Sequence, residues 1–184
     1  MGQRIVISLL MLVVFSLIGL VGINQAQANM IDLYSFDFGS NSSPVQPGSL
    51  QVTNETLYSS QLGYGWDANS TATNRSGATP PEYKDMLRDF NHSAGDRTFM
   101  IDLAAGIYSI ELYFYNTTNQ NKNNIWSVYL GNSSTVLATV NGLPKNTEVT
   151  RQFDITMGSA GQLDLRFNKT GNGNWQINGI NVAQ

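Results

Sequence analysis

The sequence predicts an all-β protein, folded as a sandwich of antiparallel strands. Three observations support this prediction. Apolar and polar residues alternate with a period of two, turn residues interrupt the alternation roughly every eight to twelve positions, and the only helical candidate is short. The pattern contains no internal repeat and no linker, which favours a single domain.

The predicted strands follow one another along the chain, each with its apolar side chains on one face. They span residues 33–39, 98–103, 106–116, 125–131, 136–142, 151–158, 161–167 and 175–182. The segments AAGIY and GSAGQL are expected to form hairpin turns, with glycine at the positive-φ position. One or two helical turns are expected within residues 81–90, after a double proline. The expected core comprises Phe36, Phe38, Phe99, Ile101, Ile110, Leu112, Phe114, Phe153, Leu165 and Phe167.

Residues 1–28 have the features of a secretory signal peptide. Arg4 precedes an apolar run over residues 5–23, and a small-residue cleavage site ends at Ala28. We therefore expect a mature domain of residues 29–184, secreted or held at the cell surface. Because the apolar run is long for a signal peptide, an uncleaved membrane anchor is the alternative.

Composition excludes several classes of function. The chain has 13 acidic and 10 basic residues, a formal net charge of -3, and no cysteine. Without a basic run or stripe, nucleic acid is a poor partner. Without cysteine, disulfides, zinc fingers, thiol catalysis and iron–sulfur sites are excluded, so the domain must rely on its core.

Asparagine is unusually frequent, and eight asparagines begin Asn-x-Ser/Thr triplets. Each triplet is a glycosylation candidate if the host modifies exported proteins, and each used site must lie at the surface. Alternatively, the triplets arise by chance in a surface rich in Asn, Ser and Thr. The candidates are Asn41, Asn54, Asn69, Asn74, Asn91, Asn116, Asn132 and Asn168.

Two long loops, residues 59–81 and 116–124, are the expected binding regions, because long loops on a β-sandwich commonly carry function. The first contains the segment GYGW. Its Tyr64 and Trp66 offer aromatic faces for the C–H patches of a sugar, and Arg75 offers hydrogen bonds to hydroxyl groups. The alternative is that Trp66 folds back and closes the open end of the sandwich.

Further binding candidates lie on the strands beside these loops. Tyr113 and Tyr115 are expected on the outward face of their strand, and Trp175 begins the last strand. The Arg88–Asp89 pair lies between two apolar residues, which favours an internal ion pair over a ligand contact.

Catalysis is not expected. The single histidine, His92, has Ser93 and Asp96 close by in sequence, but neighbours on one loop do not form a catalytic triad. No Gly-x-Ser-x-Gly segment is present. Among the acids between residues 67 and 96, nothing in the sequence indicates that two carboxylates face each other, as glycoside hydrolysis requires. The preferred interpretation of His92 is a solvated loop residue.

The order of several motifs resembles a known family. The segments FDFGS, LGYGW, LRDF, FMIDLAAGIYSIELYF, WSVYLG, QLDLRF and NWQINGINV follow one another over residues 35–182. This order is similar to that of the malectin-like, galactose-binding-fold modules found beside bacterial polysaccharide esterases and lyases.

The resemblance implies a jelly-roll β-sandwich of two antiparallel sheets that often binds carbohydrate. Two departures limit what is transferred: the sequence ends at Gln184, where such modules usually continue into a hydrolase, and the stretch after Phe114 lacks the Tyr-Phe pair of malectin. Related sandwiches often hold a structural calcium ion, for which Asp37 is the one candidate ligand. Because no Asp-x-Asp-x-Asp-Gly loop occurs, neither a metal site nor a cofactor is predicted.

Two functions therefore compete. The first is a secreted, non-catalytic carbohydrate-binding module that recognises a polysaccharide or glycan, alone or beside a separately encoded enzyme. The second is a structural glycoprotein of the cell surface or extracellular matrix that assembles through the same sandwich. An exposed cluster of Tyr64, Trp66 and Trp175 would favour the first, and a long unpaired edge strand the second.

Overall fold

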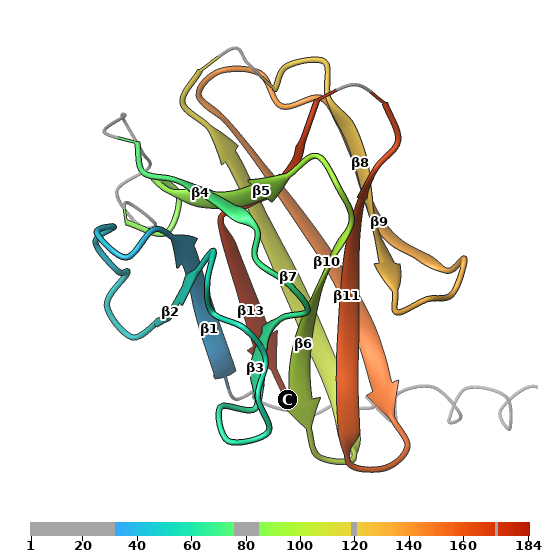
Figure 1. Cartoon of the computed structure of the whole chain (residues 1–184). Helices are drawn as coiled ribbons and strands as arrows, with labels where there is room; N and C mark the ends of the chain where they lie inside the picture. Colours follow the sequence, from blue (N-terminus) through green and yellow to red (C-terminus); the bar gives the residue numbers. More distant parts are fainter. Residues whose placement is uncertain (1–31, 76–84, 119–120, 172) are drawn as a thin grey trace, which may run out of the picture.

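The computed structural model describes residues 32–75, 85–118, 121–171 and 173–184, and these residues form an all-β sandwich (Figure 1). The described residues contain thirteen strands and no helix, and hence no helix long and apolar enough to cross a membrane. The predicted signal segment, residues 1–28, lies outside the described residues.

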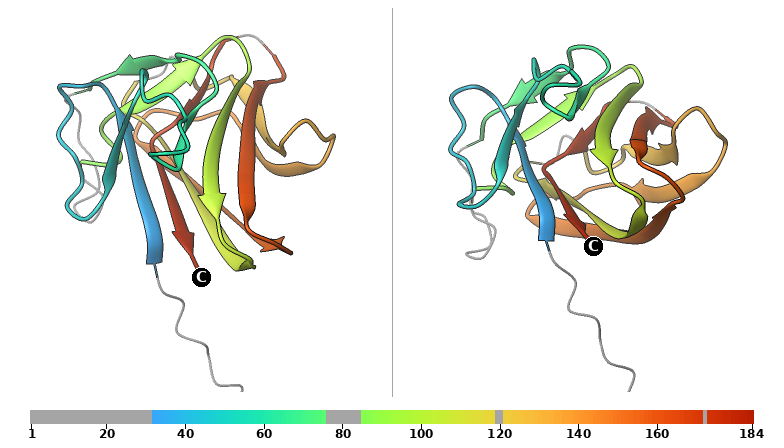
Figure 2. Two further views of the ribbon diagram at one scale, coloured as in Figure 1. Left: turned by 60° about the horizontal axis from the view of Figure 1, so that its bottom comes forward. Right: turned by 90° about the horizontal axis from the view of Figure 1, so that it is seen from below.

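Two five-stranded sheets form the layers of the sandwich, which the end-on views show face to face (Figure 2). All strand pairs are antiparallel except β1–β2. The first sheet has the order β10 (Thr147–Met157), β7 (Gly106–Asn116), β13 (Gly179–Ala183), β1 (Asp32–Gly39) and β2 (Leu50–Thr53). The second has the order β3 (Tyr64–Trp66), β6 (Arg97–Leu103), β11 (Gly161–Lys169), β8 (Ile125–Leu130) and β9 (Val136–Asn141).

The core lies between these sheets and confirms the predicted inward faces. Phe36 and Phe38 from β1 meet Phe99 from β6 with ring centroids 5.2 and 5.0 Å apart, both in edge-to-face geometry. Nine of the ten predicted core residues are buried. The exception is Phe153, which is only partly buried because β10 lies at the edge of its sheet.

A small third sheet was not predicted, although its last strand begins the predicted strand 175–182, which the structure divides between two sheets. It consists of β4 (Thr71–Thr73), β5 (Phe90–Ser93) and β12 (Trp175–Ile177), and β4 and β5 cross the upper end of the sandwich in Figure 1. The expected helical turns are absent from the described part of residues 81–90, where residues 85–88 form a turn. We call this third sheet the cap.

Alternation along the cap strands separates a core side from an outer side. On the core side, Trp175 and Ile177 are fully buried, and Asn91 accepts a hydrogen bond from the Trp66 indole N–H at 3.0 Å. On the outer side, Phe90 and His92 stand in register with Thr73 and Thr71 of β4. Because His92 on the outer side is partly exposed, a ligand can approach the cap from this side.

The second glycine of the GYGW segment, Gly65, is required by a close approach of two backbone segments. Its φ is 142°, and an added Cβ would lie 2.4 Å from the backbone N of Tyr58. The Tyr58 N–H donates to the Trp66 carbonyl at 2.9 Å, and the Trp66 N–H donates to the Thr56 carbonyl at 2.8 Å. The glycine therefore lets residues 56–58 pack directly against β3.

The long edge strand β10 has an inward-pointing charge. Arg151 alternates with Phe153 on the inner side, and its Nε donates to the Thr139 carbonyl of β9 at 3.0 Å. Inward-pointing charges are one way in which proteins keep edge strands from pairing with other chains.

Candidate functional site

Trp66 and Trp175 do not form the expected exposed aromatic cluster. Their exposed fractions are 1% and 0%, and their ring centroids lie 5.5 Å apart in the core. Each indole N–H has a partner inside the protein, the Asn91 side chain for Trp66 and the Gly95 carbonyl for Trp175. Both rings therefore close the end of the sandwich, and neither has a face free for a sugar.

The three predicted tyrosines are also unsuitable as stacking platforms. Tyr64 is partly buried against Phe36, with ring centroids 4.9 Å apart. Tyr113 and Tyr115 point away from the main core, as expected, but Met86 and Leu87 cover them to form a second buried cluster. As candidate binding residues these two rings were expected to be accessible, and that expectation is wrong because Met86 and Leu87, which lie between β4 and β5, fold over this face of the sheet.

Arg75, by contrast, lines a polar recess on the outer side of the cap. The recess has a volume of about 100 Å³. Its walls come from four separate stretches of chain: β4 and the residues after it, β5, the segment before β8, and the segment before β12. The lining residues are Thr73, Arg75, Phe90, His92, Asn121 and Asn174. We call this feature the cap recess.

His92 lines the cap recess and has a partner at each ring nitrogen. Its Nε2 lies 3.0 Å from the Thr73 hydroxyl, and its Nδ1 accepts a hydrogen bond from the Asn174 amide at 2.9 Å. An amide nitrogen at Nδ1 matches the neutral ring with its proton on Nε2, directed at the Thr73 hydroxyl. Burial lowers the pKa of His92, and the nearby charge of Arg75 lowers it further.

Arg75 is held from two sides. Its guanidinium carbon lies 5.8 Å from the centroid of the Phe90 ring, and its backbone N–H donates to Asp89 Oδ1 at 2.7 Å. Asp89 is fully buried and also contacts Arg88 Nε at 3.4 Å, so the predicted internal Arg88–Asp89 pair is present. Through its bond to the Arg75 backbone, Asp89 connects this pair to the recess.

A chain of amide side chains fixes the remaining wall. Asn124 donates to Asn121 Oδ1 at 2.9 Å and to the Asn174 carbonyl at 3.1 Å. Asn121 donates to the buried Gln176 side chain, which in turn donates to the Tyr115 carbonyl at 2.7 Å. These contacts orient the two recess amides before any ligand arrives, which reduces the entropy cost of binding.

His92, Asn121, Asn174 and Thr73 were not singled out from the sequence, although Thr73 and Asn121 lie within the two loops, 59–81 and 116–124, that were expected to bind. The interpretation of His92 as a solvated loop residue is wrong, because it lies on β5 with a partner at each ring nitrogen. The available signal was alternation within the short segments FNHS and WQI, which places His92 and Gln176 opposite the buried Asn91, Trp175 and Ile177. Strands of three or four residues are too short for that signal to stand out from a polar loop.

The other residues considered for catalysis do not meet at His92. The Asp96 carboxylate contacts Asn168 at 2.8 Å and Arg166 at 3.3 Å instead. The Ser93 hydroxyl accepts the Gly95 N–H at 3.0 Å. No group of three or more His, Asp or Glu side chains in the described residues is arranged to hold a metal ion.

Two of the eight glycosylation candidates are buried. Asn91 is 0% and Asn116 1% exposed, and their side-chain amides donate to the carbonyls of Gly39 and Leu143. In the folded protein these two asparagines cannot carry a glycan. The other six are exposed or partly exposed: Asn41, Asn54, Asn69, Asn74, Asn132 and Asn168.

Comparison with proteins of known sequence and structure agrees with this architecture. The chain is 29% identical over 149 residues to beta-agarase A of Zobellia galactanivorans, a match that covers 80% of this chain and 26% of the agarase. It therefore spans about a quarter of that relative. The structure is similar to protein YxiM of Bacillus subtilis, with a TM-score of 0.60, 23% identity and coverage of 82% of this chain and 39% of the other.

A beta-glucuronidase of Bacteroides uniformis has a domain of the same fold, with a TM-score of 0.63, 16% identity and coverage of 83% of this chain and 18% of that enzyme. Over residues 34–173 the chain matches the family described as beta-agarase/YXIM esterase-like, galactose-binding domain-like. This confirms the predicted galactose-binding-like sandwich and the resemblance to modules found beside polysaccharide esterases. The chain belongs to the galactose-binding-like domain family of the beta-agarases and YxiM-type esterases.

Proposed function

We propose that this chain is a non-catalytic domain that binds a polysaccharide through the cap recess. The observation that carries the proposal is the convergence of an imidazole, a guanidinium and two amides in one pre-organised recess. The Thr73 hydroxyl and the two amides keep hydrogen-bonding capacity beyond their contacts within the recess, and His92 holds Thr73 and Asn174 in place. This arrangement suits the hydroxyl groups of a sugar.

The size of the cap recess indicates how much of a sugar it would hold. Its volume of about 100 Å³ is below the range of roughly 300–1,000 Å³ typical of sites that enclose a small molecule. We therefore propose that one edge of a sugar unit enters, while the remainder of the polymer stays outside. Such a site suits an internal unit or an end of a long chain.

The absence of catalysis is part of the proposal. No carboxylate lines the recess, and both ring nitrogens of His92 are engaged by Thr73 and Asn174 rather than by an acid and a nucleophile. Since one relative is named a beta-agarase, we propose a galactan of the agar type as the ligand class. The predicted signal peptide supports a secreted or surface location.

The test is binding to agarose by variants of the cap recess. His92→Ala and Asn174→Ala should each weaken retention in agarose affinity electrophoresis at least tenfold. Asn174→Ala removes a direct contact, and His92→Ala removes the ring that positions Thr73 and Asn174. The melting temperature should change by only a few degrees, since both side chains lie on the outer side of the cap. Asn132→Ala is the matched control, an exposed asparagine on the turn between β8 and β9.

Two results would overturn this proposal. One is that both recess variants bind agarose as strongly as the parent. The other is that Asn132→Ala weakens binding to the same extent, which would place the ligand elsewhere on the surface.

The structural alternative has one specific observation in its favour, the length of β10. This strand has eleven residues and lies at the edge of the first sheet. Assembly through β10 would require displacement of the inward-pointing Arg151, which is why we rank this function second.

A further inference from the structure

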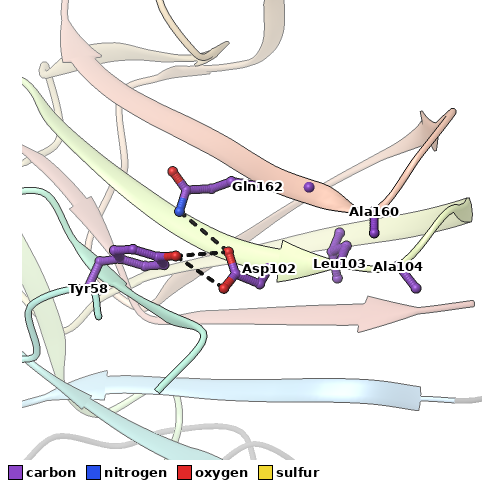
Figure 3. Close-up of a pocket in the computed structure, with 7 residues that line it drawn as sticks. Tyr58, Asp102, Leu103, Ala104, Ala160 and Gln162 are labelled. Carbon is purple, nitrogen blue, oxygen red and sulfur yellow. Dashed lines mark hydrogen bonds between the residues drawn. The ribbon is translucent and has the colours of Figure 1, made fainter. Parts of the chain in front are cut away.

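A second concave feature lies far from the cap recess, where β6 ends and β11 begins (Figure 3). It is an open groove of about 560 Å³, within the usual size range of small-molecule sites. Its lining residues are Tyr58, Asp102, Leu103, Ala104, Ala160, Gly161 and Gln162. Because β6 runs from the cap to the opposite end of the sandwich, the groove and the cap recess lie at opposite ends of the second sheet (Figure 1).

The groove has an ordered polar wall. The Tyr58 hydroxyl donates to both oxygens of the Asp102 carboxylate, at 3.2 and 3.1 Å, and Gln162 Nε2 donates to Asp102 Oδ1 at 3.4 Å. Figure 3 shows the three side chains converging on one point. A carboxylate accepts about four hydrogen bonds, so Asp102 retains acceptor capacity for a ligand, and the Gln162 carbonyl is a further acceptor.

The backbone fixes this wall before a ligand arrives. The Asp102 N–H donates to the Gly63 carbonyl at 2.7 Å, and Tyr58 is anchored through its own N–H to Trp66. Tyr58 can approach β3 only because Gly65 has no side chain. The same GYGW segment that buries Trp66 thus positions Tyr58 at the groove.

The opposite side of the groove is small and apolar. Ala104, Ala160 and Gly161 present at most a methyl group each, and Leu103 is buried beneath them. A flat ligand can therefore lie across this side with its C–H groups against the alanines while its polar edge reaches Asp102 and Gln162. This combination of an aromatic ring, small apolar residues and a few convergent polar groups is suited to a sugar ring.

The negative charge of the groove disfavours anionic sugars. Asp102 is the one charged residue among those that line the groove. The next acid along the β11 face is Asp164, whose pKa is raised by burial and by the neighbouring Asp67 carboxylate. Sulfated or uronic sugars would meet negative charge here without a balancing lysine or arginine.

We propose that this groove is a second carbohydrate-binding site that accepts neutral sugar units. The proposal rests on the proposed function as a polysaccharide-binding domain, but it concerns a different surface and different residues. With two sites placed in this way, one domain could bind a single polymer at both ends of the sandwich, or it could bind two separate polymers.

The test separates the two sites by calorimetric titration with a neutral agar oligosaccharide. Tyr58→Ala and Gln162→Ala are made in the parent and in His92→Ala. In the His92→Ala background, each groove variant should weaken the remaining affinity at least tenfold. Gln162 is exposed, so its replacement leaves the fold intact even if Tyr58→Ala lowers the melting temperature. Tyr129→Ala is the control, a tyrosine on β8 that packs under Arg166 outside the groove.

The outcomes distinguish the two proposals. If His92→Ala abolishes binding and the groove variants bind like the parent, the groove is overturned and the cap recess stands. If only the groove variants lose binding, the groove is supported and the cap recess is overturned. If the parent binds no agar oligosaccharide, both are overturned. A sulfated galactan oligosaccharide should bind the His92→Ala protein at least tenfold more weakly than the neutral one, and equal affinity would overturn the assignment to neutral sugars.

Discussion

At the scale of single residues, Trp66 illustrates the choice between a binding and a structural aromatic. Glycines and small polar residues surround it in sequence, as in a sugar-binding loop, yet the ring is buried between Phe38, Phe99, Phe167 and Trp175. Its indole N–H requires a partner once buried, and Asn91 provides it. Polar neighbours in sequence therefore do not establish that an aromatic is exposed.

Replacing Trp66 should reduce stability. Trp66→Ala removes a buried aromatic and should lower the free energy of unfolding by about 3–5 kcal/mol. For a domain of this size that corresponds to a drop of roughly 6–20 °C in melting temperature, measured by scanning calorimetry. Trp66→Phe keeps most of the packing but removes the N–H, and it should cost about 1–3 kcal/mol. A Trp66→Ala protein that melts with the parent would contradict the buried placement.

A second residue-scale prediction concerns Asp37, which is 2% exposed and accepts the Gln46 N–H at 2.6 Å. Burial raises the pKa of Asp37 from 3.8 to about 7, and the neighbouring Asp89 and Asp85 carboxylates also raise it, against the lowering effects of the Gln46 hydrogen bond and Arg88. The folded protein therefore holds this proton more tightly than the unfolded chain between about pH 4 and pH 7. In that window the Asp37 contribution to stability falls as pH rises, by at most about 1.4 kcal/mol per pH unit.

Asp37→Asn should remove this pH dependence, because the amide oxygen still accepts from Gln46 and does not titrate. Thermal unfolding of both proteins at pH 4, 5, 6, 7 and 8 measures the difference. The variant should gain stability relative to the parent as pH rises, with the gain levelling off above pH 7. Parallel profiles would contradict an elevated pKa of Asp37.

At the scale of elements, prediction from sequence succeeded where strands are long and failed where they are short. Alternation over 106–116 and 161–167 identified β7 and β11, because one buried face imposes a period of two. The cap strands β4 and β5 have three or four residues and a polar outer side, so they could not be told from loops in sequence. The third cap strand, β12, was predicted only as the start of one longer strand over 175–182. The cap recess combines residues from four distant stretches, which no local pattern can join. Two of the stretches lie in the predicted binding loops 59–81 and 116–124, but Arg75 was the only lining residue named as a binding candidate.

The packing of residues 56–58 on β3 leads to a prediction for Gly65. In Gly65→Ala the new Cβ would lie 2.4 Å from Tyr58 N and 2.6 Å from the Leu57 carbonyl carbon, at a φ of 142°. Backbone strain alone should cost about 1–3 kcal/mol, and Tyr58 should move away from Asp102. Gly158→Ala is the matched control, since nothing lies within 4 Å of its added Cβ. Unfolding curves in urea measure both, and equal midpoints would contradict the close approach.

Arg151 leads to a prediction about self-association. Arg151→Val removes the inward charge and the hydrogen bonds to the Thr139 and Thr150 carbonyls, so that the inner side of this long edge strand carries no charge. The variant should show concentration-dependent association in sedimentation velocity, whereas the parent stays monomeric. Thr156→Val changes an exposed position of the same strand without removing a charge and should behave like the parent. A parent that already associates would favour the structural alternative.

At the scale of the whole molecule, burial divides the Asn-x-Ser/Thr triplets into two groups. Asn91 and Asn116 support the cap and the end of β7 from inside, and their amides are engaged. If the protein is produced in a host that glycosylates exported proteins, peptide mass spectrometry should find these two sites unmodified and sugar only among the other six. A glycan at Asn91 on folded protein would contradict the placement of β5.

The pairing of the first and last strands has a mechanical consequence. Asp32 stands opposite Ala183 at one end of an antiparallel ladder between β1 and β13, and both strands begin or finish at that point (Figure 2). A force applied through the two ends of this domain would open that ladder one hydrogen-bonded pair at a time, because the load falls on the outermost pair first. Strands pulled in shear share the load across the whole ladder and resist it longer. The domain should therefore yield at low tension when stretched from its ends, while a pull between the cap and either end would meet the packed core.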